Sequence, residues 1–373
     1  MSYIINLGGY NLKALLFITG RGMGGDAMNA LNIARSLEAE GVQCELVLDT
    51  DAPGLLFKKH GYSWHKSSIP QAGGTAFTKS RAFKAGLKSI KAILSGVKLI
   101  KKTKADVVVG IIGGGAVIGC VSAKLARVPA VGMIDTPLDT KVCTRLNQCI
   151  VLPEAQLFKE DILPENVEKS FFPLTPGLTQ GNKENGLNKI KEHLDNLRKE
   201  FPDKVFPEFD ENKKTILFSS GSSLFELTAK GLKNFIDVTE DYNVVLIGSP
   251  LEESYLDYVD ESKVINVGYI DWIKDLYACT DLAVLTDDGV MIQEAIACEL
   301  PSVALTRVKY GRYHNMESIF PGAVIESEFE DLNDKIFYAL DNLDEIQSKT
   351  SYYTKEVLVA GKKIANIVLN QKK

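Results

Sequence analysis

Along the whole chain, short apolar runs rich in β-branched residues alternate with longer amphipathic helical stretches. This alternation is typical of parallel sheets, because each crossover between parallel strands is made by a helix that covers one face. The first half predicts strands at 14–19, 45–49, 107–112, 130–134 and 148–152; the second half predicts them at 215–219, 243–247, 263–267, 282–285 and 302–305.

Two segments with similar beginnings indicate that the chain contains two such sheets. "KALLFITGRG" from Lys13 and "KTILFSSGSS" from Lys214 both place a glycine-bearing turn directly after an apolar strand. Between them, "FFPLTPGLTQGN" supplies Pro173, Pro176 and Gly177 as a domain boundary, followed by the charged helical run "KENGLNKIKEHLDNLRKEF". A chain of 373 residues is also too long for one ordinary core.

We therefore predict an α/β protein with two doubly wound, Rossmann-like domains, spanning 1–175 and 176–351. A C-terminal helix at 352–373 is expected to pack back on the first domain. Ligands of open α/β sheets bind beyond the carboxyl ends of the strands. The expected active site is thus a central cleft between the two facing domains.

Composition agrees with a globular cytoplasmic protein. Hydrophobic residues make up 45% and charged residues 24% of the chain. The six cysteines are scattered without C-x-x-C spacing, which predicts reduced, buried thiols. The segment "MSYIINLGGYNLK" does not have the pattern of a secretion signal, and the longest uncharged run, 107–123, is short for a membrane span and contains five glycines.

The charge distribution singles out a basic segment in the first half. The net charge is -5, yet no acidic residue lies between Asp51 and Asp106, a window with twelve Lys or Arg. Within it, 79–104 predicts a basic amphipathic helix, a pattern typical of contact with anionic membranes. The expected contact residues are Arg81, Phe83, Lys84, Leu87, Lys88 and Lys91; the alternative is a solvated basic face. The acidic chain and its few aromatic residues near this segment exclude nucleic acid as a partner.

The first glycine-rich loop raises the question of a dinucleotide site. Gly20, Gly22 and Gly25 match G-x-G-x-x-G, and Asp49 is placed to hold a ribose. Asp26 argues against a dehydrogenase, because its carboxylate would compete with a pyrophosphate for the helix N-terminus. An acid facing a cleft suits a general base instead, with a helix N-cap as the alternative role for Asp26.

Taken together, these segments resemble the GT-B glycosyltransferases, and among them the MurG family, which adds N-acetylglucosamine from its UDP form to a polyprenyl-diphosphate-linked sugar. "GMGGD" occupies the family's G-x-G-G-H loop, with Asp26 in the place of the histidine. "GIIGGGAVIGCVSAKLARVPAVGMIDTPLD" corresponds to the family's second glycine-rich loop and H-E-Q-N turn, which makes Asp135 and Asp139 further candidates for the base. The resemblance implies acceptor or phosphate contacts from Gly22, Gly24, Gly25, Gly113, Gly114 and Gly115.

The second half is similar to the family's donor-binding segment. In "NVGYIDWIKDLYACTDLAVLTDDGVMIQEAIACELPSVAL", Glu294 falls on the glutamate that holds the uridine ribose, and a carboxylate can accept two hydroxyl hydrogen bonds. The alternative for Glu294 is a solvated helix residue. "SSGSS" corresponds to the family's G-G-S loop, which implies diphosphate contacts at a helix N-terminus, although alone it reads as an ordinary turn. The implied donor-binding residues are Gly221, Ser222, Ser223, Ile270, Asp288, Gly289, Val290, Glu294, Arg312 and Asn315.

Two departures from the family pattern fall where the donor sugar is recognised. Gly311 and Arg312 replace its paired glutamines, and the segment 286–289, "TDDG", replaces its arginine and S-G-A. A guanidinium beside the sugar suits the carboxylate of a uronic acid donor; a second diphosphate contact or a surface charge are the alternatives.

The resemblance implies an inverting transferase that moves N-acetylglucosamine, or a related N-acetylated sugar, from a UDP-sugar to a polyprenyl-diphosphate-linked sugar in cell-wall synthesis, bacterial or of the archaeal pseudomurein type. It would act as a peripheral protein on the inner face of the membrane. No metal or other cofactor is implied, since no D-x-D pair stands where a GT-A enzyme needs one. UDP-N-acetylglucosamine 2-epimerases share this architecture and need no lipid acceptor. A non-catalytic donor-binding module is the third alternative.

Overall fold

The chain forms two compact units. The computed structural model describes residues 12–19, 24–69, 79–158, 162–287, 290–307 and 315–371, and of residues 79–87 it describes the backbone. The first unit comprises Met1–Pro173 and Val359–Lys373, and the second comprises Leu174–Leu358. The chain therefore passes between the units twice, first within the proline-containing segment and again near the C-terminus.

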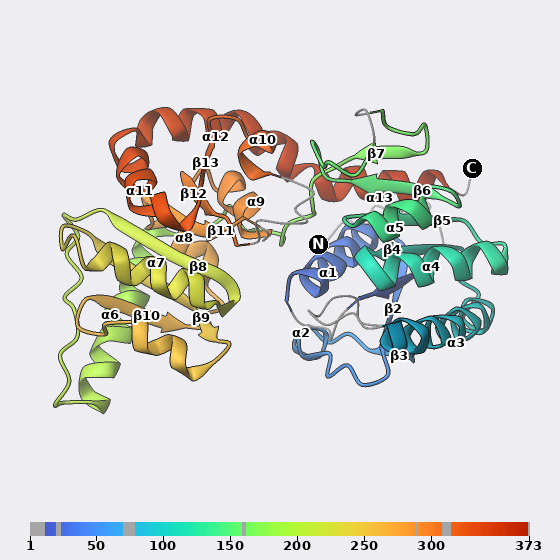
Figure 1. The fold of residues 1–373 in the computed structure, drawn as a ribbon, viewed down its shortest axis with the longest axis horizontal. Helices are drawn as coiled ribbons and strands as arrows, with labels where there is room; N and C mark the ends of the chain where they lie inside the picture. Colours follow the sequence, from blue (N-terminus) through green and yellow to red (C-terminus); the bar gives the residue numbers. More distant parts are fainter. Residues whose placement is uncertain are drawn as a thin grey trace, which may run out of the picture. The chain divides into compact units, whose positions relative to one another are not determined.

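The first unit is built on a parallel sheet of seven strands in the order β3-β2-β1-β4-β5-β6-β7 (Figure 1). The order reverses between β1 and β4, which is the pattern of a doubly wound sheet. The strands are β1 (Lys13–Ile18), β2 (Gln43–Asp49), β3 (Trp64–Ser67), β4 (Val107–Ile111), β5 (Ala130–Met133), β6 (Gln148–Val151) and β7 (Val167–Lys169).

Helices cover both faces of this sheet because neighbouring residues of β1 point to opposite sides. Leu16 joins a core with Leu31 of α1 and Ile364 of α13, whereas Phe17 joins a second core with Ile100 of α3. The helices of this unit are α1 (Gly25–Ala39), α2 (Leu55–Lys59), α3 (Lys79–Thr103), α4 (Ile112–Ala126), α5 (Pro137–Cys143) and α13 (Ala360–Asn370).

The predicted single C-terminal helix at 352–373 is two helices in the structure. α12 (Leu343–Leu358) belongs to the second unit, and only α13 packs on the first unit, against α1. Gly361 permits the close approach, since a Cβ atom there would lie 2.5 Å from the Ser36 hydroxyl oxygen on α1. The sequence pattern stays helical across Val359, so it does not reveal where the chain changes units.

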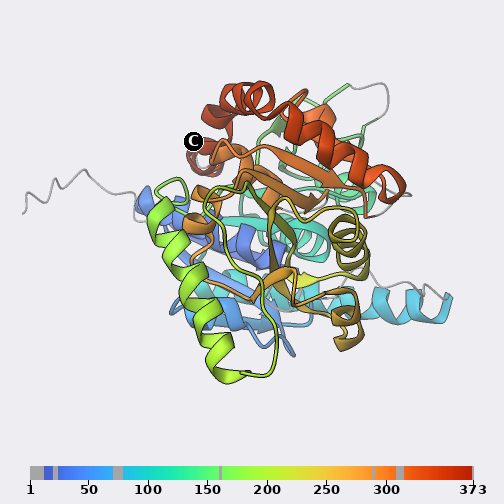
Figure 2. The ribbon, with the colours of Figure 1, turned by 90° about the vertical axis from the view of Figure 1, so that its left-hand side faces the viewer.

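The second unit repeats the arrangement with six parallel strands in the order β10-β9-β8-β11-β12-β13. Figure 2 shows α6, in light green, running along the side of this unit, where it packs against α8 and the edge strand β10. The strands are β8 (Thr215–Leu224), β9 (Asn243–Pro250), β10 (Val264–Gly268), β11 (Leu282–Thr286), β12 (Ser302–Leu305) and β13 (Val324–Ser327). The helices are α6 (Lys183–Glu200), α7 (Glu226–Ile236), η2 (Glu253–Tyr258), α8 (Ile273–Ala278), α9 (Val290–Ala297), α10 (Met316–Ile319), η3 (Phe329–Asp331), α11 (Leu332–Asp341) and α12.

Each of the ten predicted strands corresponds to a strand of the structure, but β3, β7 and β13 were not predicted. All three lie at sheet edges and read "WHKS", "VEK" and "VIES". An edge strand is paired on one side only, so it does not need the continuous apolar run that marks a central parallel strand.

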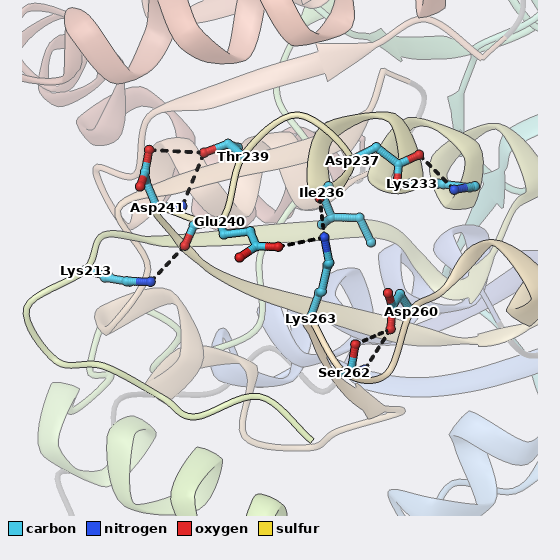
Figure 3. Close-up of polar contacts among 10 residues, drawn as sticks. All are labelled: Lys213, Lys233, Ile236, Asp237, Thr239, Glu240, Asp241, Asp260, Ser262 and Lys263. Atoms are coloured by element: carbon cyan, nitrogen blue, oxygen red, sulfur yellow. Dashed lines mark hydrogen bonds and ion pairs between the residues drawn. The ribbon is translucent and has the colours of Figure 1, made fainter. Parts of the chain in front are cut away.

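The amino-terminal edge of the second sheet carries a set of polar contacts that are satisfied among themselves (Figure 3). The Lys263 ammonium lies 2.8 Å from the Glu240 carboxylate, and the Ser262 hydroxyl donates to Asp260 over 2.6 Å. On α7, Lys233 pairs with Asp237 at 2.8 Å. Exposed pairs of this kind contribute little to stability, because solvent screens them. They join the end of α7 to the start of β10, far along the strands from the carboxyl ends where ligands bind.

Among the described residues, no helix combines the length and the apolar character needed to cross a bilayer.

Candidate functional site

Each sheet has one point at which the strand order reverses, between β1 and β4 in the first unit and between β8 and β11 in the second. Helices leave neighbouring strands in opposite directions at such a point, which opens a crevice beyond the carboxyl ends of the strands.

In the first unit, Asp26 is the second residue of α1 and is half-buried. Gly24, with a φ of 81°, is the N-cap of the helix, so Asp26 is not the cap that we considered as its alternative role. Burial, followed by the negative charges of Asp135 and Asp139, raises the pKa of Asp26 from 3.8 to about 6. A carboxylate with this pKa is ionised at neutral pH and is basic enough for proton transfer.

Asp139 has a different role from the one predicted. It has no exposed surface, and its carboxylate accepts the backbone N–H groups of Gly113 at 2.7 Å and Thr136 at 2.9 Å. It also forms a capping box with Thr136 at the start of α5. Burial raises the pKa of Asp139 in spite of these donors. Asp139 thus ties the start of α4 to the start of α5, and we no longer consider it a candidate base. Asp135 is half-buried and remains one.

The glycine-rich loop before α4 is occupied by the protein's own side chains. The N–H group of Gly113 donates to Asp139, and that of Gly115 donates to the Thr19 hydroxyl at 2.6 Å. A Cβ atom at residue 115 would lie 2.6 Å from the Phe17 carbonyl oxygen, so the glycine serves close packing on β1. The N–H groups of Gly113 and Gly115 are therefore already used within the protein and are not available to a phosphate, while an acceptor contact at this loop stays a prediction. Gly114 and Gly25 have no such contact among those described, Gly24 is the cap, and Gly22 lies outside the described residues.

In the second unit, Glu294 lies on α9 and is half-buried, not fully solvated. Its Oε2 accepts a hydrogen bond of 3.0 Å from the hydroxyl of Tyr277, which lies on α8 and is 3% exposed. Burial raises the pKa of Glu294, and the Tyr277 hydrogen bond lowers it in part. Tyr277 was not among the predicted site residues; the available signal was a tyrosine near the end of one short helix, followed by a carboxylate on the next helix.

The segment predicted as a phosphate-binding turn is an irregular part of a strand. β8 was expected to end at Ser219 but continues to Leu224, with a shift in its register against β9 between Ser219 and Ser223. α7 begins only at Glu226. Gly221–Ser223 therefore does not form the start of a helix, because the bulged strand finds further pairing with the end of β9.

Hydrogen bonds fix this bulge from within. The Gly221 N–H group donates to the Ser219 hydroxyl at 3.0 Å, and the Ser220 hydroxyl accepts from the Phe225 N–H group at 3.0 Å. Gly221 has a φ of 94°, a left-handed conformation that favours glycine. Ser222 is exposed to solvent. The role of Gly221, Ser222 and Ser223 in binding a diphosphate stays a prediction.

The other residues predicted to bind the donor lie in separate elements of the second unit or outside the described residues. Ile270 is half-buried between β10 and α8, and Val290 is the first residue of α9. Asn315 is the N-cap of α10, where its Oδ1 accepts the Ser318 N–H group at 2.8 Å. Asp288, Gly289 and Arg312 lie outside the described residues.

Sequence reasoning missed a contact between two charged residues, formed through a backbone N–H group, at the ends of β11 and β12. Asp287 is 2% exposed, and its carboxylate accepts the backbone N–H group of Arg307 at 3.0 Å. The guanidinium of Arg307 lies over the ring of Phe225, 4.8 Å from its centroid. The pair places a cation at the carboxyl edge of the sheet, beside the residue that precedes α7.

The basic helix α3 presents both expected and unexpected residues. Lys91 is exposed, but the ammonium of Lys88 lies 3.6 Å from the buried Asp49 carboxylate, which ties Lys88 to the sheet. Ile90, an apolar residue expected to insert into the membrane, and Leu94, which was not predicted, are 56% and 57% exposed. The side chains of Arg81, Phe83, Lys84 and Leu87 lie outside the described part of the chain.

Comparison with known proteins identifies the fold. No protein-family model and no curated protein sequence matches the chain. Solved structures match it over nearly its whole length. MurG from Acinetobacter baumannii is 16% identical with a TM-score of 0.66, and the match covers 97% of this chain and 100% of that chain. Anabaena HepE in complex with UDP-glucose is 16% identical with a TM-score of 0.63, and UDP-GlcNAc 2-epimerase from Neisseria meningitidis bound to UDP-GlcNAc is 12% identical with a TM-score of 0.61; each of these two matches covers 96% of this chain and 100% of the other chain. Together with the two Rossmann-like units, these matches show that the chain has the GT-B fold.

Proposed function

We propose that the chain is an inverting glycosyltransferase of the MurG type, which transfers N-acetylglucosamine or a related N-acetylated sugar from UDP to a lipid-diphosphate-linked sugar in cell-wall precursor synthesis. The observation that carries the proposal is Asp26, a half-buried carboxylate with a pKa of about 6 at the reversal point of the first sheet. A transferase of this kind needs such a base to activate its acceptor. The altered H-E-Q-N turn and the replaced glutamines leave room for a pseudomurein-type acceptor.

In this proposal the second unit holds the donor. Glu294 accepts hydrogen bonds from the ribose hydroxyls, and the bulge at Gly221–Ser223 offers exposed polar groups to the diphosphate. The A. baumannii MurG and Anabaena HepE chains, the latter solved with UDP-glucose, share this fold. That likeness supports a UDP-sugar as the donor.

The reaction is a single displacement at the anomeric carbon. The acceptor hydroxyl oxygen forms a bond to that carbon as the bond to the UDP oxygen breaks, so the configuration inverts. Asp26 takes the proton of the hydroxyl, and UDP leaves with the electron pair of the broken bond. No oxidation state changes, so the step requires no redox cofactor, and we propose that it requires no metal.

The test of the function is turnover with and without an acceptor. UDP-N-acetylglucosamine should stay unchanged when it is incubated with the protein alone, and UDP should be released when a polyprenyl-diphosphate-linked sugar is added. Phosphorus and proton NMR distinguish the products. The likeness to the N. meningitidis epimerase bound to UDP-GlcNAc favours a second candidate, a 2-epimerase. An epimerised UDP-sugar formed without acceptor would establish that candidate and refute the transferase.

A lipid-linked acceptor predicts that α3 contacts anionic membranes. Ile90 and Leu94 form an exposed apolar pair, and Lys91 and Lys98 are exposed beside them. Each Lys near an anionic surface contributes about 1 kcal/mol, so reversing two charges should lower the affinity by roughly two orders of magnitude or more. In vesicle sedimentation, Lys91→Glu/Lys98→Glu should therefore remain in the supernatant.

The matched control for this prediction is Lys349→Glu/Lys355→Glu, a reversal of two exposed charges on α12 of the second unit. It should sediment as the parent does. If both double variants bind vesicles equally weakly, binding depends on net charge alone. If the parent never sediments, the proposed membrane contact of α3 is refuted.

A further inference from the structure

The geometry points to Tyr277 as a positioning residue that makes the donor site selective for ribose over 2′-deoxyribose, because it holds the Glu294 carboxylate in one orientation. The inference deepens the proposed function and depends on it, since it assumes that Glu294 binds the ribose of a UDP-sugar. Tyr277 itself does not contact the nucleotide in this scheme.

Tyr277 is rigidly placed because α8 is fixed to α6. Asp275, 4% exposed on α8, pairs with the Lys189 ammonium at 2.7 Å and accepts the Asn182 N–H group at 3.0 Å. Gly186 allows the two helices to touch, since a Cβ atom there would lie 2.3 Å from the Asp275 carbonyl oxygen. The hydroxyl of Tyr277 is therefore delivered to Glu294 from a helix that cannot easily shift.

The hydrogen bond leaves the carboxylate able to bind a diol. Tyr277 occupies one acceptor position of Oε2, while Oε1 and the second position of Oε2 remain available for two ribose hydroxyls. A free glutamate side chain would lose rotamer freedom when it binds, and a side chain already held loses less. The contact between Tyr277 and Glu294 is thus a form of preorganisation.

The electrostatics support the same arrangement. Burial raises the pKa of Tyr277 well above its ordinary value, so its hydroxyl remains a donor throughout the working pH range. Burial also raises the pKa of Glu294, and the hydrogen bond from Tyr277 opposes that rise by favouring the ionised form. An ionised carboxylate accepts stronger hydrogen bonds than a protonated one.

The experiment is a titration of UDP and of 2′-deoxy-UDP, by calorimetry, into the parent and into Tyr277→Phe. The parent should bind UDP about 10–100-fold more tightly than 2′-deoxy-UDP, because 2′-deoxy-UDP leaves one acceptor position of the half-buried Glu294 carboxylate without a donor. Tyr277→Phe should weaken UDP binding about 5–20-fold and 2′-deoxy-UDP binding only about 2-fold, so that the preference for UDP over 2′-deoxy-UDP becomes smaller. A matched control is Tyr258→Phe, which removes an exposed hydroxyl 3.5 Å from the Glu226 carboxylate and should change neither affinity.

A double-mutant cycle with Glu294→Gln separates positioning from a general structural role. If Tyr277 acts through Glu294, adding Tyr277→Phe to Glu294→Gln should have little further effect on UDP affinity. An unchanged preference in Tyr277→Phe, or an equal loss for both nucleotides, would overturn the inference while UDP binding by the parent stands. A parent that does not bind UDP would refute the proposed function itself, and the inference with it.

Discussion

Asp26→Asn is expected to lower turnover by about 10²–10⁴-fold, the usual contribution of a positioned base, and to leave UDP affinity unchanged. The asparagine has nearly the same shape but cannot take the acceptor proton. In the parent, the rate should fall as the pH drops through about 6, the pKa that burial and the neighbouring carboxylates give Asp26. The acid limb should disappear from the residual activity of the variant. Steady-state kinetics from pH 5 to 8 measure both effects.

The same substitution is expected to stabilise the fold at neutral pH. The folded-state pKa of Asp26 is about 6 against 3.8 for an ordinary Asp, so the folded protein binds more protons than the unfolded chain between these values. Its stability therefore falls as the pH rises from about 4 to 6, by about 3 kcal/mol in all. Asp26→Asn avoids this loss of stability, but it also removes the favourable contact between the Asp26 carboxylate and the N-terminal dipole of α1, which costs about 0.3–1 kcal/mol.

Denaturant unfolding at two pH values tests this stability difference. Asp26→Asn should exceed the parent by about 2 kcal/mol at pH 7 and should not exceed it at pH 4, where the parent carboxyl is protonated when folded. A variant that is less stable at pH 7 would indicate that Asp26 is a structural residue of α1.

Asp135→Asn is the companion variant for turnover. If it abolishes turnover and Asp26→Asn does not, Asp135 is the base.

Glu294→Ala is expected to raise the Kd for UDP by about 10–100-fold. The substitution removes charge-assisted hydrogen bonds to the ribose, which contribute about 1.5–3 kcal/mol, and it leaves the Tyr277 hydroxyl buried without its acceptor. Binding of a nucleoside-free pyrophosphate should be unaffected. Isothermal titration of UDP and of pyrophosphate into parent and variant measures the difference.

Glu345→Ala provides the matched control, because Glu345 is an exposed glutamate on α12 of the same unit. It should bind UDP as the parent does. UDP affinity that survives Glu294→Ala would place the nucleotide elsewhere on the protein and would leave Tyr277 without the function inferred for it.

The sequence was sufficient to predict the fold because both sheets have long apolar central strands. Strands that are paired on both sides leave a strong pattern, and nine of the ten predicted strands are of this kind; the tenth, β10, is an edge strand with the apolar run "VINVG". Edge strands such as β13 leave a weak pattern, since only one of their sides is paired. The GT-B architecture followed from the repeated arrangement and the resemblance, and the structural matches confirm it.

The site was harder to predict, because local motifs do not reveal which groups are already used within the protein. The glycines at 113 and 115 read as a phosphate loop, yet their N–H groups are bound by Asp139 and Thr19 from distant parts of the chain. Likewise, "SSGSS" reads as a turn, but pairing with the end of β9 extends it as a strand. Conversely, Arg307 and Tyr277 carry no motif, and their neighbours become visible only in three dimensions.

Because the chain passes between the units twice, the second unit is translated in full before the first unit is complete. The core beneath α1 includes Ile364, Ala365, Ile367 and Val368 of α13, so the first unit lacks part of its interior until the residues after Leu358 have been translated. The second unit is continuous and can fold before that moment. At about 5–20 residues per second, the ribosome takes roughly 10–40 s to traverse Leu174–Leu358. For that interval the apolar face of α1 that α13 covers in the folded protein has not yet received this helix.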